Sequence, residues 1–170
     1  MSLEQLWNGW RAEYVGSDAL RTTDSSQSVF SRILTSGLSD EDTHIVHRST
    51  RCFAILNAYP YAAGHILVLP YREIPHLEDL TSEESLDLWS TVTNATLALR
   101  ASHSPEALNV GINLGAAAGG SIAQHLHVHV VPRWTGDSNF MTALASTRTI
   151  PEPLPLTATK IRGAWPKGDQ

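Results

Sequence analysis

The sequence predicts an α+β fold, built on a mainly antiparallel five-stranded sheet with flanking helices. Five segments have the apolar alternation or the short β-branched apolar runs of strands, and they are expected over residues 43–49, 51–57, 65–70, 106–113 and 124–133. Short turns join several of them, and the strands lie outside the helical patterns rather than alternating with them. This arrangement favours antiparallel pairing over a doubly wound parallel sheet.

The first half of the chain is expected to contain a hairpin followed by a third strand. Residues 43–49 and 51–57 carry β-branched side chains, and the segment 58–64 then supplies turn residues, with Pro60 fixing φ and Gly64 able to adopt a positive φ. The apolar run after Gly64 is expected to end at Pro70. Before the hairpin, residues 17–28 are expected to form a loop and residues 25–34 to include a short helix.

The clearest helix is expected over residues 80–102. Thr81 and Glu84 have the spacing of a capping box, and apolar or small side chains recur at three- and four-residue intervals, at Leu86, Trp89, Val92, Thr93, Thr96, Leu97 and Leu99. Residues 115–120 form a loop of small residues, and a short helix is expected up to residue 147. From Pro151 the sequence is Pro-rich and is expected to be a polar tail in which Trp165 is the one large apolar residue.

These segments predict three parts: an N-terminal extension (residues 1–38), a central domain (39–147) and a C-terminal tail (148–170). In the extension, Leu6, Trp7 and Trp10 are expected to anchor it to the domain.

Composition limits the classes of function. The 170 residues carry a net charge of −5, which disfavours binding to nucleic acid, and no apolar run approaches the ~20 residues of a membrane span. A lone cysteine, Cys52, permits neither an internal disulfide nor a cysteine-based zinc cage. The first ten residues lack the pattern of a signal peptide, so a cytoplasmic location is expected.

The most informative segment contains three histidines at alternate positions, His125, His127 and His129. In a strand these side chains share one face, while Leu126, Val128 and Val130 share the other. The apolar face has to pack on a core. Three imidazoles therefore lie in a row where a ligand can reach them.

Three explanations compete for this row. Structural histidines account for a single position but poorly for three alternate ones. A zinc site is the second, but residues i and i+4 of a strand lie about 13 Å apart, so at most two of the three imidazoles converge on one ion. Phosphorus chemistry is the third, because imidazole is a nucleophile near neutral pH and neighbouring imidazoles can donate to phosphoryl oxygens. The adjacent Gly119-Gly120-Ser121 can turn backbone N–H groups toward an anion, which favours this reading.

At these residues the chain resembles the histidine-triad family, whose signature alternates three histidines with hydrophobic residues and ends on two hydrophobic residues. His125-Leu-His-Val-His-Val-Val131 fills every position. The segment from Phe53 to Pro70 resembles the family's strand–turn–strand element. The segment 131–140 (Val-Pro-Arg-Trp-Thr-Gly-Asp-Ser-Asn-Phe) is similar to a bacterial branch that includes actinobacterial diadenosine tetraphosphate phosphorylases.

The resemblance implies roles for named residues. His127 is the expected nucleophile, which forms a nucleotidyl-histidine intermediate; His125 and His129 bind phosphate or hold the geometry, and His65 supports the triad. The expected substrate contacts are Asn57 to ribose and Asn113, Gly120 and Ser121 to phosphate oxygens. Two departures concern the leaving group: Ile122 stands where several eukaryotic members have Ser or Thr, and Ser121 stands where the fragile-histidine-triad branch has Gln.

The resemblance also implies the reaction and its partners. The expected substrate is a nucleotide or dinucleoside polyphosphate, and the expected reaction is phosphorolysis of diadenosine tetraphosphate to ATP and ADP with inorganic phosphate as acceptor. Hydrolysis, phosphoramidase activity, a low-turnover nucleotide-binding module and a metal-binding protein remain alternatives. No protein-bound metal is expected; Mg²⁺ is expected only with the substrate phosphates. A homodimer is expected, held partly by the helix over residues 80–102.

Overall fold

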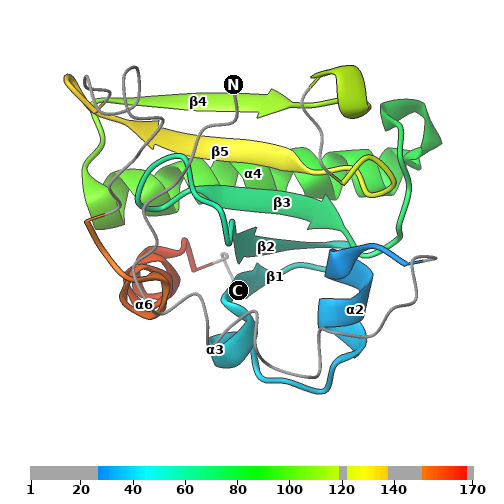
Figure 1. Cartoon of the computed structure of the whole chain (residues 1–170), viewed down its shortest axis with the longest axis horizontal. Coiled ribbons are helices and arrows are strands. Elements are labelled where there is room, and N and C mark those ends of the chain that lie inside the picture. Colours follow the sequence, from blue (N-terminus) through cyan, green and yellow to red (C-terminus); the bar gives the residue numbers. More distant parts are fainter. Residues whose placement is uncertain (1–26, 119–121, 138–150, 168–170) are drawn as a thin grey trace.

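The computed structural model describes residues 27–118, 122–137 and 151–167. They form one five-stranded sheet in the order β1–β2–β3–β5–β4, with every neighbouring pair antiparallel (Figure 1). The strands are β1 (Ile45–Arg48), β2 (Cys52–Leu56), β3 (Ile66–Pro70), β4 (Ala107–Ile112) and β5 (Val128–Arg133). The predicted α+β class and five-stranded antiparallel sheet are confirmed.

The turn between β2 and β3 depends on Gly64. This residue has a φ of 84°, and a Cβ placed on it would lie 2.9 Å from Cδ2 of Leu99. Glycine is therefore needed here both for its backbone conformation and for the close approach of the turn to the long helix.

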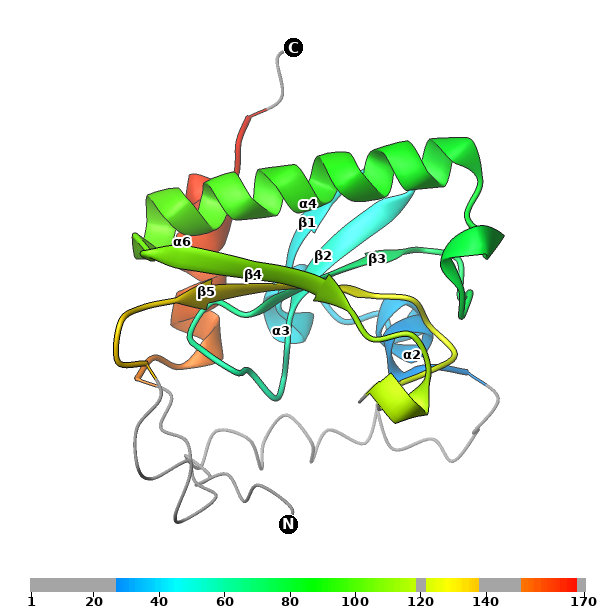
Figure 2. The same cartoon turned by 90° about the horizontal axis from the view of Figure 1, so that it is seen from above.

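One face of the sheet is covered by α4 (Ser82–His103), and Figure 2 shows this helix running along that side of the strands. Both hydrogen bonds of the predicted capping box between Thr81 and Glu84 are present. Small and branched residues of α4 pack against the inner strands, and this first core includes Leu88, Val92, Ala95, Leu99, Val68, Val128 and Val130. The helix is confirmed, but Leu86, Trp89 and Leu97 of the expected apolar pattern are exposed.

The opposite face carries a second, smaller core. The short helix α2 (Val29–Thr35) lies there (Figure 2), where Phe30 and Ile33 pack on Phe53, Leu67 and Leu69. The predicted short helix within residues 25–34 thus exists and begins after the N-cap Ser28. A single helical turn, α3 (Asp40–Thr43), leads into β1, and the 3₁₀ turns η2 (Leu77–Asp79) and η3 (Ala116–Ala118) complete the connections.

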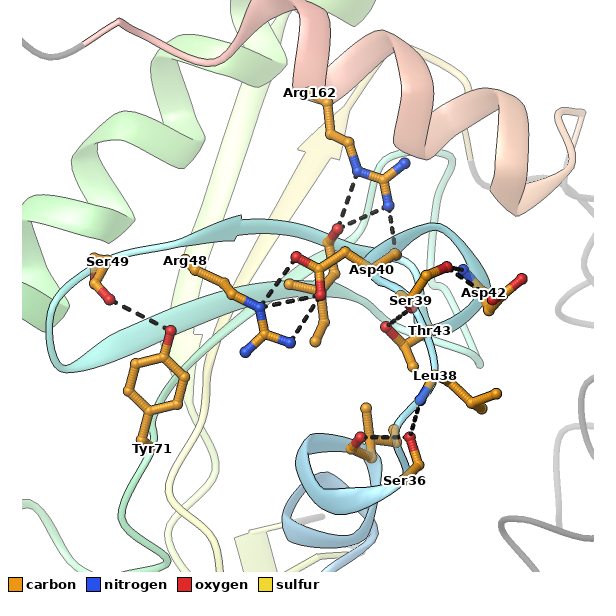
Figure 3. Close-up of polar contacts among 12 residues, drawn as sticks. Ser36, Leu38, Ser39, Asp40, Asp42, Thr43, Arg48, Ser49, Tyr71 and Arg162 are labelled. Carbon is orange, nitrogen blue, oxygen red and sulfur yellow. Dashed lines mark hydrogen bonds and ion pairs between the residues drawn. The ribbon is translucent and has the colours of Figure 1, made fainter.

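The expected polar tail is wrong for residues 154–164, which form helix α6 (Leu154–Ala164). Leu154, Ala158 and Ile161 recur at helical spacing and are buried with Trp165 in the first core. Arg162 also donates to the backbone carbonyls of Ile45 and Asp40 (Figure 3), which secures α6 to β1 and α3. This segment completes the fold rather than trailing from it.

Several expectations fall on residues that are not described: the anchoring role of Leu6, Trp7 and Trp10, most of the loop expected over residues 17–28, and the short helix ending near residue 147. In the part of the chain that is described, none of the helices combines the length and apolarity needed to cross a bilayer.

Candidate active site

The histidine segment keeps its two faces, although the strand is shorter than expected. β5 begins at Val128 rather than near Gln124, because Leu126 donates its N–H to Ile74 O (2.7 Å) instead of joining the ladder. Leu126, Val128 and Val130 nevertheless all lie in the core beneath α4. The histidines alternate with them, so the sequence-predicted separation of packing and chemistry is confirmed.

His127 has one ring nitrogen fixed by the backbone. Its Nδ1 lies 2.8 Å from the carbonyl oxygen of His125. A carbonyl can only accept, so Nδ1 carries the proton and, in the neutral ring, Nε2 carries the lone pair. Nε2 of His127 is therefore the nucleophilic atom that this arrangement provides.

His125 is fully buried and bonded at both ring nitrogens. Nε2 lies 2.9 Å from Pro70 O and must donate, so Nδ1 accepts from the hydroxyl of Ser28 at 2.8 Å. Burial lowers the pKa of His125, which keeps the ring neutral in this tautomer. His125 therefore acts by holding its own backbone carbonyl, and with it the ring of His127, in place.

Ser28 serves two structures at once. Its Oγ accepts the N–H of Ser31 at the start of α2 while its hydroxyl donates to His125. Its own N–H donates to both carboxylate oxygens of Glu73 at 3.0 Å, and the hydroxyl of Ser31 donates to the same carboxylate. The first turn of α2 is thereby joined to the first histidine of the triad.

His65 and His129 form a second directed chain. Nδ1 of His65 accepts the backbone N–H of Tyr61 (3.1 Å), so the proton of His65 lies on Nε2, which is 3.0 Å from Nδ1 of His129. His129 then accepts at Nδ1 and carries its own proton on Nε2. The β3–β5 register, which pairs Leu67 with His129, brings the two rings together.

Nε2 of His129 is buried and has no hydrogen-bond partner among the residues that the structure describes. Burial, and secondarily the neighbouring His127, lowers the pKa of His129 to about 4, so it is a neutral donor at physiological pH. An unpaired buried donor is costly unless a ligand satisfies it. A phosphoryl oxygen is a suitable acceptor.

Phe30 of α2 forms an apolar wall beside the row. Its ring centroid lies 5.6 Å from that of His125 and 5.7 Å from that of His127. The ring centroids of His127 and His129 are 4.9 Å apart, so His127 has the apolar ring of Phe30 on one side and His129 on the other.

The expected substrate-binding residues divide into three groups. Asn57 lies beside His65, with its Nδ2 at 3.3 Å from His65 Nδ1, and its Oδ1 accepts the N–H of Tyr59, so it also shapes the turn. Asn113 lines a pocket that His129 also lines. Gly120 and Ser121 lie outside the described residues, and their phosphate contacts stay predictions.

Four residues that shape the site could not be assigned to it from the sequence: Ser28, Phe30, Tyr61 and Glu73. Ser28 had a local signal, because a serine before a short apolar helix is a typical N-cap. The contacts of Phe30 and Glu73 join residues more than 40 positions apart and leave no local pattern.

The described residues offer few ligands for a metal ion at this site. Among residues 27–118, 122–137 and 151–167, no three histidine, cysteine or acidic side chains are arranged to hold one ion. Nδ1 of both His127 and His129 is already used in a hydrogen bond within the protein.

Comparison with known proteins places this site in a family. The HIT domain model matches residues 39–136. An AP-4-A phosphorylase of Mycobacterium tuberculosis is 40% identical over 165 residues, which span 96% of this chain and 85% of that protein. An asymmetrical bis(5'-nucleosyl)-tetraphosphatase of Schizosaccharomyces pombe is 36% identical over 56% of this chain and 52% of its own length.

Solved structures agree with the fold. A zinc-bound histidine-triad protein of Mycobacterium smegmatis is 26% identical with a TM-score of 0.66, covering 81% of this chain and 92% of that one. A HIT-like protein of Bartonella henselae is 25% identical with a TM-score of 0.63, covering 78% and 90%. The triad, its tautomer-fixing hydrogen bonds and the family model agree, and the chain belongs to the histidine-triad (HIT) family.

Proposed function

We propose that this chain cleaves diadenosine tetraphosphate by nucleotidyl transfer through His127, with inorganic phosphate as the acceptor, to give ATP and ADP. The observation that carries the proposal is the lone pair on Nε2 of His127, fixed by the 2.8 Å hydrogen bond from Nδ1 to His125 O. The similarity to the AP-4-A phosphorylase over 96% of the chain supports the choice of substrate and acceptor.

In the first step, Nε2 of His127 attacks the α-phosphorus. A nitrogen–phosphorus bond forms, the bond from phosphorus to the bridging oxygen breaks, and ATP leaves with that oxygen. The modified ring becomes a cation that keeps its proton on Nδ1. The carbonyl of His125 accepts that proton's hydrogen bond and so stabilises the positive charge.

His129 acts on the oxygens of the same phosphorus. Its Nε2–H has no partner in the described part of the chain and donates to an oxygen on which charge develops. His65 keeps this proton on Nε2 by occupying Nδ1. A neutral donor held in this way needs no rearrangement as the reaction proceeds.

In the second step, an oxygen of inorganic phosphate attacks the nucleotidyl phosphorus. A phosphorus–oxygen bond forms, the bond to Nε2 breaks, and ADP leaves with the neutral His127 regenerated. The acceptor carries between one and two negative charges at neutral pH, so its approach requires hydrogen-bond donors. Asn113 and the predicted donors of Gly120 and Ser121 are assigned to this task.

The test identifies the acceptor directly. Diadenosine tetraphosphate is incubated in oxygen-18 water with and without millimolar phosphate, and the products are analysed by mass spectrometry. Unlabelled ADP beside ATP, at a rate that rises with phosphate, is expected. Labelled AMP beside ATP, at a rate indifferent to phosphate, would establish a hydrolase, the second candidate that the similarity to the S. pombe tetraphosphatase favours.

Mg²⁺ belongs to the substrate in this proposal. The four phosphates carry the negative charge that the cation neutralises, and the protein contributes imidazole donors. The expected result is that Mg²⁺ changes KM for the dinucleotide, while purified protein contains no stoichiometric metal.

We also propose a homodimer formed through β4 and α4. β4 is an edge strand whose Val110 is exposed, and unpaired strand edges are templates for pairing with another chain. Leu86, Trp89 and Leu97 of α4 add exposed apolar surface. Light scattering is expected to give twice the mass of the chain at micromolar concentration, and Trp89→Glu is expected to shift the protein toward the monomer.

A further inference from the structure

A pocket of about 580 Å³ lies beside the triad, over β5 and β4. His129 lines it, and its other walls include Tyr61, Asn109, Asn113, Val131 and Arg133. The size falls in the range of small-molecule binding sites, roughly 300–1,000 Å³.

The strand register explains why the pocket is open next to His129. In the β4–β5 ladder, Gly111 is paired with His129, and Asn109 is paired with Val131. Residues directly opposite one another project on the same face, so the missing side chain of Gly111 leaves space beside the imidazole. A Cβ added at Gly111 would meet nothing within 4 Å.

The charges in the pocket argue against a bare polyphosphate as its occupant. Among the described residues that line it, the one cation is Arg133, which donates to both carboxylate oxygens of Asp137, at 2.6 and 2.8 Å, and to Asn109 Oδ1 at 2.9 Å. An arginine paired in this way leaves little positive charge for phosphate. The pocket therefore suits an uncharged group.

Its remaining walls suit a nucleoside. The ring of Tyr61 is half exposed and lies nearly parallel to that of His129, at 13° and 5.9 Å between centroids. An aromatic face offers stacking to a base, Val131 offers apolar contact, and the amide of Asn109 offers a donor and an acceptor to a base edge or ribose hydroxyls.

We infer that this pocket binds the distal nucleoside of the dinucleoside polyphosphate, the one that departs with the leaving nucleotide. The inference rests on the proposed function, because only a substrate with two nucleosides has such a group. The apolar wall of Phe30 lies beside His125 and His127, whereas the pocket is lined by His129, next in the row. The phosphate chain attacked by His127 can therefore place one nucleoside toward Phe30 and the other in the pocket.

The test fills the pocket and compares two ligands. Gly111→Leu places a side chain in the open space, and Gly163→Leu on α6, where an added Cβ also meets nothing within 4 Å, is the matched control. Calorimetry gives Kd for the α,β:α′,β′-bismethylene analogue of diadenosine tetraphosphate, which resists cleavage at the α-phosphorus of either adenosine. The second ligand is the α,β-methylene analogue of adenosine tetraphosphate, which has four phosphates but no distal nucleoside.

Gly111→Leu is expected to weaken the dinucleotide analogue at least about tenfold and the mononucleoside analogue less than about twofold, while Gly163→Leu changes neither. Tyr61→Leu, which keeps the backbone N–H that His65 accepts, is expected to weaken the dinucleotide analogue selectively, by about three- to tenfold. If Gly111→Leu does not fold, the Kd values of Tyr61→Leu test whether the pocket binds the distal nucleoside.

Two results would overturn the inference. An equal loss for both ligands would assign the pocket to the reacting adenosine, and unchanged Kd values for both would show that neither nucleoside occupies it. These binding measurements do not depend on turnover. A wild-type protein that binds the dinucleotide but does not cleave it would contradict the proposed function. The Kd values of the variants would still decide whether the pocket binds the distal nucleoside.

Discussion

His65 donates from Nε2 to Nδ1 of His129 across 3.0 Å, and this one hydrogen bond decides which nitrogen of His129 carries the proton. His65 is fixed in turn by the backbone N–H of Tyr61, which every substitution at that position except proline retains. The relay therefore begins in the main chain and ends at a buried Nε2–H that no described residue accepts.

The first prediction is that substitutions of His129 and His65 have non-additive effects on kcat. His129→Ala is expected to lower kcat about 10²–10³-fold, the usual cost of removing one donor to a developing charge. His65→Ala is expected to cost about tenfold, because it only releases the tautomer of His129. In the double variant His65→Ala adds almost nothing, since its target is gone. Steady-state kinetics of the four proteins checks this cycle, and multiplicative losses would show that His65 acts independently.

A second prediction concerns the nucleophile. His127→Ala is expected to lower turnover by more than about 10⁴-fold while nucleotide binding and the melting temperature remain close to wild type, because the packing residues lie on the other face of the segment. Rapid-quench mass spectrometry is expected to find a nucleotidyl adduct on the wild-type protein and none on the variant. Turnover within tenfold of wild type would remove His127 from this role.

Ser28 supports a third prediction that separates positioning from stability. Ser28→Ala loses an N-cap and leaves Nδ1 of buried His125 without its donor, which is expected to cost about 1–3 kcal/mol of unfolding free energy. Released from Ser28, the His125 ring can reorient, so kcat is expected to fall with KM nearly unchanged.

Ser28→Thr retains the hydroxyl and is the matched control. Urea unfolding gives the stability change, and nitrogen-15 shifts of the imidazoles report the tautomer of His125. If Ser28→Ala loses stability but keeps both kcat and the His125 tautomer, then Ser28 is only a helix cap.

The fourth prediction is a loss of stability in mild acid. Burial is the largest cause of the lowered pKa values of His44, His47, His103, His125 and His129. When the pKa of a histidine is lower in the folded protein than in the unfolded chain, its contribution to stability is fully present above pH 6.5, the pKa in the unfolded chain. That contribution is lost as pH falls, because the unfolded chain takes up protons first. For His129 the window extends from 6.5 down to about 4.

The free energy of unfolding is therefore expected to fall between pH 7 and pH 5, before the carboxylates titrate. Urea titrations give the free energy of unfolding at each pH in this range, and its slope against pH is proportional to the difference in bound protons between the unfolded and folded states. His129→Gln is expected to reduce that slope. A stability that is flat from pH 7 to pH 5 would contradict the neutral assignment of these rings.

Much of the sheet could be predicted from local pattern, because β-branched runs bounded by turn residues set strands β1 to β4 within one or two residues. The start of β5 could not, since the hydrogen bond from Leu126 to Ile74 that replaces the ladder depends on a segment 52 positions away. Helix α6 did have a signal in the spacing of Leu154, Ala158 and Ile161, but the surrounding prolines obscured it. Pro155 is in fact compatible with the first turn of a helix.

The triad itself was predictable because its alternation is a property of the backbone. The relay was not, because the contact of His65 with His129 requires the β3–β5 register, and the role of Ser28 requires α2 to lie across the sheet. Local sequence thus indicates which side chains can react, whereas tertiary structure decides which nitrogen holds the proton.

The position of α6 has a consequence for biosynthesis. Its side chains fill the core shared by α4 and the sheet, and Arg162 bonds to Ile45 at a separation of 117 residues. While the ribosome is still adding residues before α6, β1 lacks this partner and apolar surface stays open to solvent. We therefore expect the domain to fold cooperatively only after α6 emerges, and nascent chains arrested before Leu154 to require chaperones and to be sensitive to protease.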